Sequence, residues 1–395
     1  MEELDNSKKY SILALPKWYP SKLDLQLGIF LKKHILAVAQ KHKVHVLYVV
    51  GDKHLKTNFE FVNTQSENFY ETIAYFSYAE CKIPPMKVVV NAILYLLAFS
   101  IAYFRFVKKN IKPDFIHVHI FGRTSLIAYF FKLFKSIPYI VSEQSSLFIT
   151  DKFSKRNFFY RMLVRLSARN ANLITAVSEV LKTRMLAYGL NNTYFVIPNV
   201  VEVSKNEIKF ESKDKIIALS VADLFDSVKN ISDVIKAVKY AIDEGYNFEY
   251  HIIGGGYDSD LLMKMAEKYG LLGKYIFFHG RQPNTFVLDF MHKIDFLITN
   301  SNYETFSVVT AEALANGKPV IATKCGGPES FVDSKVGILI DVGNLQQLKE
   351  ALIAMLKTYY TYNSDEIINS VKTKFSFQSI ANQFDEVYSN LFLIK

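Results

Sequence analysis

Residues 295–329 constrain the fold more than any other part of this chain. They begin with an apolar run, Phe296–Thr299, which is typical of a buried strand in a parallel sheet. A helix is expected at residues 305–316, because Gly317 and a proline two residues later form a common stop signal. A second buried strand is expected at Val320–Thr323, and a Gly-Gly-Pro turn closes the unit. The segment therefore predicts a strand–helix–strand unit of an α/β protein.

Two carboxylates belong to this unit, Glu304 at the expected start of the helix and Glu312 eight residues later. Eight helical residues span roughly 12 Å, close to the reach of a nucleotide sugar. The free amides of Thr305, Phe306 and Ser307 at the helix start could hold a diphosphate, helped by the helix dipole. Glu304 would then meet the sugar, and Glu312 could accept the ribose hydroxyls. The alternative is that Glu304 is only an N-terminal helix acid and Glu312 a solvated surface residue.

The order of residues around the two glutamates resembles a known family signature. Glu-x7-Glu is followed by Ala-Leu-Ala-x-Gly-x-Pro-Val-Ile-Ala-Thr and then by Gly-Gly-x-x-Glu. This pattern is similar to that of the retaining family-four glycosyltransferases, and about ten positions agree in type and spacing. The resemblance covers the whole chain and is more specific in the second half. It implies a GT-B fold, in which two Rossmann-like domains face each other across a cleft.

The resemblance also implies how the chain divides and what it does. An acceptor-binding domain is expected at residues 1–203 and a nucleotide-sugar domain at residues 204–395, joined by a polar linker at about 203–214. The last helix, about 376–395, is expected to pack back on the first domain. The implied reaction moves a sugar from a UDP- or GDP-linked donor to an acceptor hydroxyl with retained anomeric configuration.

Two candidate site residues lie in the first half of the chain. Gly28 ends a Trp-Tyr-Pro-Ser loop, and the resemblance implies that it brings backbone close to the donor phosphates; an ordinary turn glycine is the alternative. His119 lies at the carboxyl end of an expected strand, where α/β proteins place ligand sites. Family members commonly have a histidine there that meets the transferred sugar, although a lone histidine is more often structural. Gln144 stands where the family often has histidine, which points to a different recognition of the acceptor.

The second half supplies the expected phosphate-binding groups. The resemblance assigns Lys229 to the donor diphosphate, where the family usually pairs this lysine with an arginine. Asp223 stands at the position of that arginine and cannot bind phosphate, so helix amides, Lys229 or another cation such as Arg281 must compensate. Gly254 opens a three-glycine run after the expected strand Phe248–Ile253; this is a weak phosphate signal alone, but it fits a nucleotide site here.

Length and composition are consistent with this interpretation. The 395 residues suit two domains, and with half of them apolar a disordered chain is excluded. The two cysteines, Cys81 and Cys325, lie far apart without metal-ligand spacing, which fits a reducing cytoplasm. The first residues, in which acids precede a short apolar run, do not resemble a signal peptide. No Asp-x-Asp metal site with matching context is apparent, so we expect metal-independent catalysis and no cofactor.

The uneven distribution of charge suggests an anionic membrane surface as a partner rather than nucleic acid. Residues 1–200 contain 27 Lys and Arg against 13 Asp and Glu, whereas the remainder is mildly acidic. Residues 88–106 are apolar enough to span a bilayer, but an expected strand follows directly, which favours a buried or membrane-resting helix. Residues 152–170 predict a basic amphipathic helix, which either has a solvated face over the core or docks on lipid headgroups.

The sequence thus predicts a glycosyltransferase on the cytoplasmic face of a membrane, acting on a glycan or lipid-linked acceptor in cell-envelope polysaccharide or glycoconjugate synthesis. Glu304, His119 and Lys229 are its expected catalytic residues. A nucleotide-sugar epimerase or a phosphorylase of the same fold is an alternative, the phosphorylase being disfavoured because no cofactor lysine motif is evident. A non-catalytic membrane-surface protein is another alternative, supported only by Asp223.

Overall fold

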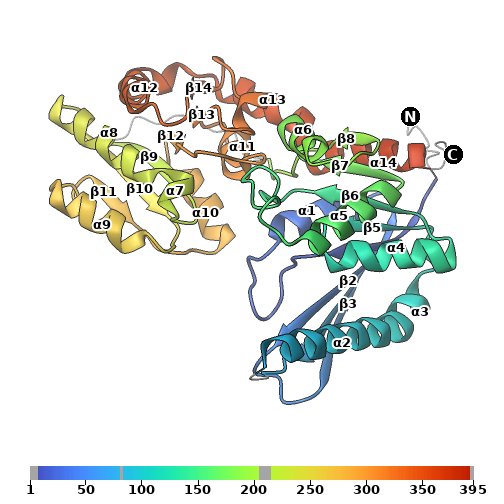
Figure 1. Ribbon diagram of the computed structural model, residues 1–395. Helices are drawn as coiled ribbons and strands as arrows, with labels where there is room; N and C mark the ends of the chain where they lie inside the picture. Colours follow the sequence, from blue (N-terminus) through green and yellow to red (C-terminus); the bar gives the residue numbers. More distant parts are fainter. Residues whose placement is uncertain (1–7, 81–82, 204–214, 392–395) are drawn as a thin grey trace. The chain divides into compact units, whose positions relative to one another are not determined.

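The computed structural model describes residues 8–80, 83–203 and 215–391, and the chain forms two compact units (Figure 1). The first unit comprises Met1–Val200 and Ile380–Lys395, and the second comprises Val201–Ser379. The chain therefore enters the second unit once and returns to the first for its last helix. The expected linker falls largely outside the described residues, as does Cys81.

The first unit, in its described residues, is built on an eight-stranded sheet with the order β3-β4-β2-β1-β5-β6-β7-β8. All neighbouring strands are parallel except β3 and β4, which form an antiparallel hairpin at one edge. The strands are β1 (Ser11–Pro16), β2 (Lys43–Asp52), β3 (Phe59–Gln65), β4 (Phe69–Ser77), β5 (Phe115–His119), β6 (Tyr139–Glu143), β7 (Leu173–Ala176) and β8 (Tyr194–Val196). The parallel strand that ends at His119 was expected from the sequence, whereas the β3–β4 hairpin was not predicted.

The helices of the first unit lie on this sheet and against one another. They are α1 (Ile29–Ala39), α2 (Pro84–Ala102), α3 (Lys108–Asn110), α4 (Arg123–Lys135), α5 (Phe158–Asn170), α6 (Glu179–Ala187) and α14 (Phe377–Leu391). α14 reaches the middle of the sheet, where the Tyr388 hydroxyl lies 2.8 Å from Nδ1 of His117 on β5. The Phe384 ring also packs against His34 on α1.

Helix α2 is apolar on both its packed and its exposed sides. It begins at two prolines, which suit the first turn because a helix needs no amide hydrogen there. Asn91, Tyr95 and Phe99 are buried, and the helix packs on β2 and β4. Continued by a π-helical turn, Tyr103–Val107, and by α3, it is long and apolar enough to cross a membrane, yet only 33% of its most apolar stretch is buried. The expectation of a buried helix therefore holds for one side only.

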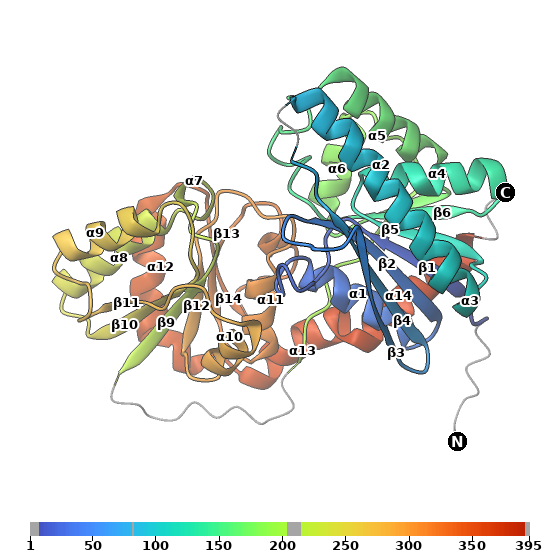
Figure 2. The same ribbon diagram turned by 90° about the horizontal axis from the view of Figure 1, so that it is seen from below.

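Helix α2 lies beside α4, which in turn contacts α5 (Figure 2). The rings of Phe99 and Phe131 join α2 to α4 with their centroids 6.4 Å apart. The exposed apolar side chains of these three helices, which we call the α2–α4–α5 surface, are Met86, Val88, Val89, Ile93, Leu96, Leu97, Ile101, Phe130, Leu133, Phe134, Phe158, Phe159, Met162 and Leu166.

Helix α5 begins later than predicted. The sequence pattern suggested a start near residue 152, but the helix begins at Phe158 because the Asn157 side chain accepts a hydrogen bond from the Tyr160 amide and caps it. Phe158 and Phe159 are 63% and 70% exposed. The apolar residues of its first turn therefore face solvent instead of the core.

The second unit, in its described residues, contains a six-stranded, fully parallel sheet with the order β11-β10-β9-β12-β13-β14. The strands are β9 (Ile216–Val221), β10 (Phe248–Ile253), β11 (Ile276–Phe278), β12 (Phe296–Thr299), β13 (Val320–Thr323) and β14 (Gly337–Ile340). The helices are α7 (Asp226–Lys229), α8 (Ile231–Asp243), α9 (Ser259–Lys268), α10 (Asn284–Met291), α11 (Val308–Ala315), α12 (Leu345–Thr358) and α13 (Ser364–Phe375). β10, β12 and β13 lie where the sequence predicted them, and the α/β fold class is confirmed.

Candidate functional site

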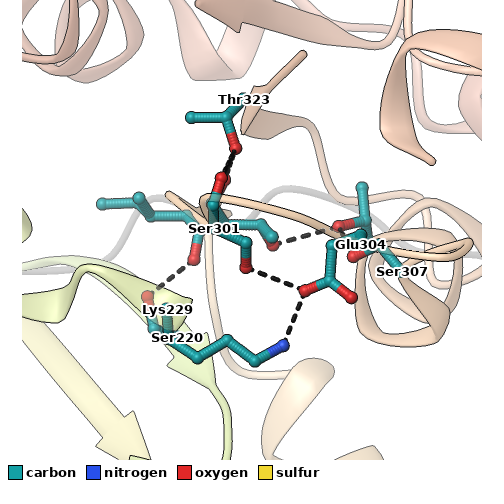
Figure 3. Close-up of polar contacts among 9 residues, drawn as sticks. Ser220, Lys229, Ser301, Glu304, Ser307 and Thr323 are labelled. Carbon is teal, nitrogen blue, oxygen red and sulfur yellow. Dashed lines mark hydrogen bonds and ion pairs between the residues drawn. The ribbon is translucent and has the colours of Figure 1, made fainter. Parts of the chain in front are cut away.

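The best-defined polar site of the second unit is an ion pair between Lys229 and Glu304. The Lys229 ammonium lies 2.6 Å from Oε1 of Glu304, although 75 residues separate them. Ser301 donates a hydrogen bond of 2.8 Å to the same oxygen, and both side chains point toward the carboxylate (Figure 3). Burial lowers the pKa of Lys229, but the Glu304 carboxylate, together with Cys325 and Asp223, raises it, and the net shift is upward, so the ammonium is stable at neutral pH. The sequence prediction thus named two residues that the fold brings together.

The pair sits where adjacent parallel strands end. Lys229 follows β9 at the end of α7, and Glu304 follows β12, its neighbour in the sheet. The Ser301 carbonyl accepts a hydrogen bond of 2.6 Å from Thr323 at the end of β13, which fixes the loop after β12. The Glu304 amide donates to the Cys325 carbonyl at 2.9 Å. Carboxyl ends of parallel strands are where α/β proteins bind ligands.

Helix α11 begins three residues later than predicted, and this corrects the placement of the helix amides. Thr305, Phe306 and Ser307 precede the helix, and Ser307 has a left-handed backbone with φ of 71°. The reason is tertiary, because Phe306 is buried and its ring packs against Phe331 and Phe375. The unpaired amides of the first turn therefore begin at Val308, and the helical rise does not set the separation between Glu304 and Glu312.

Glu312 lies within α11 and is only 6% exposed. The alternative that it is a solvated surface residue is therefore wrong. In the turn after β13, Gly327 lies so close to the Phe306 backbone that a Cβ on the glycine would come within 2.5 Å of it. Gly327 of the family signature therefore allows this close approach to the chain before α11.

The three-glycine run after β10 packs against the loop that contains Asp223. A Cβ at Gly254 would lie 1.8 Å from the Ala222 carbonyl oxygen, and one at Gly256 would lie 2.5 Å from that of Leu224. Arg281 forms an ion pair of 2.9 Å with Asp223, and both side chains are well exposed. The unexpected aspartate therefore holds the very cation that the sequence suggested as a replacement for the missing arginine.

His119 and Gly28 belong to the first unit. His119 is completely buried at the end of β5, and neither ring nitrogen has a hydrogen-bond partner within the described chain. Burial, with a smaller contribution from neighbouring histidines, holds its pKa well below the usual value, so the ring is neutral. Gly28 has φ of 71° and caps α1, and a Cβ there would lie 2.6 Å from the Trp18 backbone. This geometry gives Gly28 a structural role, while its donor role stays a prediction.

Sequence reasoning missed Ser301, the second partner of Glu304. The signal was present, because Asn300, Ser301 and Asn302 form a polar run directly after a buried strand. The side-chain amides of both asparagines donate to carbonyls of the segment around α7, at 3.0 Å each. The run therefore fastens the loop of Glu304 to the loop of Lys229. Across the described residues, no cluster of three or more His, Cys, Asp or Glu is arranged to hold a metal ion.

The sequence matches two family models and a known relative. Residues 201–370 match the family model described as Glycosyl transferases group 1, and residues 36–205 match the one described as Glycosyltransferase Family 4. An uncharacterized glycosyltransferase of Methanocaldococcus jannaschii is 29% identical over 290 residues, which cover 70% of this chain and 76% of the relative.

Two solved structures illustrate the similarity of fold. Sucrose-phosphate synthase from Thermosynechococcus elongatus superposes with a TM-score of 0.73 and 16% identity, covering 98% of this chain and 100% of that one. HepE of Anabaena, solved in complex with UDP-glucose, superposes with a TM-score of 0.66 and 17% identity, covering 96% of this chain and 100% of that one.

Proposed function

Because the chain belongs to the group 1 glycosyltransferases and has their GT-B fold, we propose that it is a retaining, metal-independent transferase. In this proposal it moves a sugar from a UDP- or GDP-linked donor to a hydroxyl of a glycan or lipid-linked acceptor. It acts on the cytoplasmic face of a membrane, in cell-envelope polysaccharide or glycoconjugate synthesis.

The observation that carries the proposal is the Lys229–Glu304 pair at the carboxyl ends of β9 and β12. Departure of a nucleoside diphosphate leaves negative charge on the phosphates and positive charge on the sugar. A fixed ammonium beside a fixed carboxylate offers one group for each charge, and preorganised groups of this kind lower the barrier. Lys229 would stabilise the leaving phosphate while Glu304 positions the sugar.

The remaining donor contacts are assigned from neighbouring groups. The first-turn amides of α11, beginning at Val308, would hold the diphosphate with the helix dipole. Arg281 would supply the second cation, because Asp223 keeps its guanidinium over the glycine loop, where a Cβ at Gly255 would lie 3.0 Å from its Cγ. The buried Glu312 would accept the ribose hydroxyls.

The proposed location rests on the first unit. Residues 81–170 contain 15 Lys and Arg against 3 Asp and Glu, and they include the helices of the α2–α4–α5 surface. Exposed apolar side chains with basic residues around them are the features of a helix that lies in an anionic lipid interface. A lipid-linked acceptor is the substrate that such a surface would reach.

The test is to incubate the purified protein with a panel of UDP- and GDP-sugars and membrane lipids, and to analyse products by mass spectrometry and proton NMR. A glycosylated acceptor with the anomeric configuration of the donor is expected, and Glu304→Gln should lose this product. Conversion of the donor to its epimer without an acceptor would instead identify an epimerase. Absence of donor turnover across the panel would favour the non-catalytic alternative.

A further inference from the structure

The first unit contains a cavity of about 490 Å³ at the carboxyl ends of β1, β2 and β4. Helix α2 and the first residues of α4 form its other walls. It is lined by Pro16, Lys17, Trp18, Val49, Val50, Gly51, Phe76, Tyr78, Val88, Asn91, Ala92, Tyr95, Arg123 and Thr124. Its volume lies in the range typical of small-molecule sites, about 300–1,000 Å³.

The polar groups of this cavity favour an anion. Its lining includes two cations, Lys17 and Arg123, and no carboxylate. The Lys17 ammonium donates to the Phe121 carbonyl at 3.2 Å, which leaves two of its three donors for a ligand. The Arg123 guanidinium lies over the Tyr95 ring, 5.1 Å from the centroid, so an aromatic wall flanks the cation on one side.

A buried hydroxyl without a partner points to the same ligand. Thr124 is 5% exposed, and its Oγ1 has no hydrogen-bond partner among the described residues. A buried hydroxyl left unpaired costs free energy, and a bound oxyanion would satisfy it.

The start of α4 adds further donors at the cavity. Arg123 and Thr124 are its first two residues, so their amides have no carbonyl one turn earlier to pair with. The helix has 13 residues and presents the positive end of its dipole here. The chain reaches this helix through Ile120, whose φ of 71° is strained for a β-branched residue.

The apolar part of the cavity continues onto the exposed α2–α4–α5 surface. Val88 lines the cavity and is also 71% exposed, so the cavity opens where α2 presents its apolar side chains. Phe76, Tyr78 and Tyr95 form aromatic walls beyond the cations. A ligand that fits must therefore combine a phosphate-like head with an apolar chain leading out to this surface.

We propose that this cavity binds a single-chain lipid phosphate, the anionic end of a lipid-linked acceptor, with the phosphate on Arg123, Lys17, Thr124 and the start of α4. The assignment rests on the proposed transferase function, because it names the acceptor class. One apolar chain suits the cavity better than the two chains of a bulk phospholipid.

The site can be tested directly because Trp18 is the only tryptophan of the chain and lies in the cavity wall. Its fluorescence should change in a saturable way with farnesyl phosphate, a short single-chain probe. Farnesol, inorganic phosphate and dihexanoylphosphatidylglycerol should each bind at least about tenfold more weakly, since each lacks the charged head, the chain or the single-chain shape.

Variants separate the cavity from the general charge of the unit. Arg123→Gln should weaken farnesyl phosphate binding about tenfold, and Thr124→Val should weaken it several-fold, without changing the affinity for farnesol. Arg184→Gln removes the same charge from an exposed position on α6 and should leave the titration unchanged. Urea unfolding of each variant checks that the fold is intact.

Three results would overturn the inference. Farnesol binding as tightly as farnesyl phosphate would remove the anion site. Equal binding of dihexanoylphosphatidylglycerol would mean a site for bulk lipid headgroups, and equal loss in Arg184→Gln would mean non-specific charge. Calorimetry with UDP and GDP on the same samples tests the proposed transferase separately, so failure of nucleotide binding is distinguishable from failure of the Trp18 titration.

Discussion

The Nζ atom of Lys229 lies 2.6 Å from Oε1 of Glu304, across two loops that follow neighbouring strands. The two side chains are 22% and 14% exposed, so the pair is largely shielded from water. Both residues lie in segments that follow neighbouring strands, β9 and β12. The Ser301 hydroxyl also donates a hydrogen bond to the Glu304 carboxylate. In the proposed reaction, the charges for the departing diphosphate and the sugar would thus be in position at no further cost in ordering, which is the basis of the first prediction.

Replacement of Glu304 and of Glu312 should have different effects. Glu304→Gln keeps the shape but removes the charge beside the sugar, so turnover should fall at least about 100-fold with little loss of nucleotide affinity. Glu312→Gln should chiefly weaken nucleotide binding, by about tenfold. Steady-state rates and calorimetry with free UDP and GDP separate the two effects. Equal loss of nucleotide affinity in both variants would contradict these roles.

Gly254 should tolerate no side chain. A Cβ would lie 1.8 Å from the Ala222 carbonyl oxygen, and the φ of 144° is one that other residues rarely adopt. Gly254→Ala should therefore displace the Asp223 loop and destabilise the protein by about 2 kcal/mol or more. Gly245→Ala is the matched control, because its φ of 90° is also positive but a Cβ there would contact nothing within 4 Å. Urea unfolding measures both, and an equal effect would argue against a steric cause.

Activity should survive removal of divalent metals. The proposal assigns stabilisation of the leaving diphosphate to Lys229, Arg281 and the first turn of α11, which are cations and dipoles of the chain itself. Initial rates after treatment with EDTA should therefore match those of the untreated enzyme. A complete loss of rate that Mg²⁺ or Mn²⁺ restores would refute metal independence.

Binding to membranes should depend on both anionic lipid and salt. Each basic residue near an anionic surface contributes about 1 kcal/mol within a Debye length, so binding should weaken steeply as salt rises. The exposed rings of Phe158 and Phe159 should leave a salt-resistant remainder, which Phe158→Ser/Phe159→Ser should reduce. Co-sedimentation with anionic and neutral liposomes across a salt series tests this. Equal binding to neutral vesicles would exclude the electrostatic part, and release by detergent alone would favour a true span.

The first unit should lose stability on mild acidification because of its buried histidines. Burial lowers the pKa of His34 and His45 to about 4 and that of His117 to about 3, and holds that of His119 well below its usual value. As the pH falls below about 6.5, the unfolded chain takes up these protons and the folded chain does not, so the free energy of unfolding decreases.

Each such histidine costs about 1.4 kcal/mol per pH unit below about 6.5, until its folded pKa is reached. Urea unfolding followed by Trp18 fluorescence at pH 7.5 and 5.5 measures the effect. His45→Gln should make the dependence shallower, whereas His54→Gln, at an exposed position, should not. Equal stability at the two pH values would disprove the account.

The sequence predicted the second sheet well because its strands are short apolar runs that end at glycine, proline or polar loops. The same reasoning failed at Thr305–Ser307. These residues were expected to begin the helix, but they precede it because Phe306 is buried in the core. The partners of that ring, Phe331 and Phe375, are distant in sequence. Local patterns cannot report packing of this kind.

The candidate site, like the fold, was predicted only in part from the sequence. Lys229 and Glu304 were predicted one by one from the resemblance, but their contact depends on the order of β9 and β12 in the sheet. The β3–β4 hairpin was missed because most of β3 is exposed and its polar side chains carry little apolar periodicity. The cavity proposed to bind a lipid phosphate was missed because its cations, Lys17 and Arg123, come from segments that meet only when β1 and β5 pair.

The position of α14 affects how the protein is made on the ribosome. Its Tyr388 covers Phe115 and contacts His117, residues that leave the ribosome long before it. The whole of Val201–Ser379 is translated in between. At a translation rate of about 5–20 residues per second, roughly 10–40 s pass between the synthesis of Val200 and the synthesis of α14. During this interval the central strands expose apolar surface that chaperones would recognise, so cellular yield should depend on them more than the stability of the finished protein suggests.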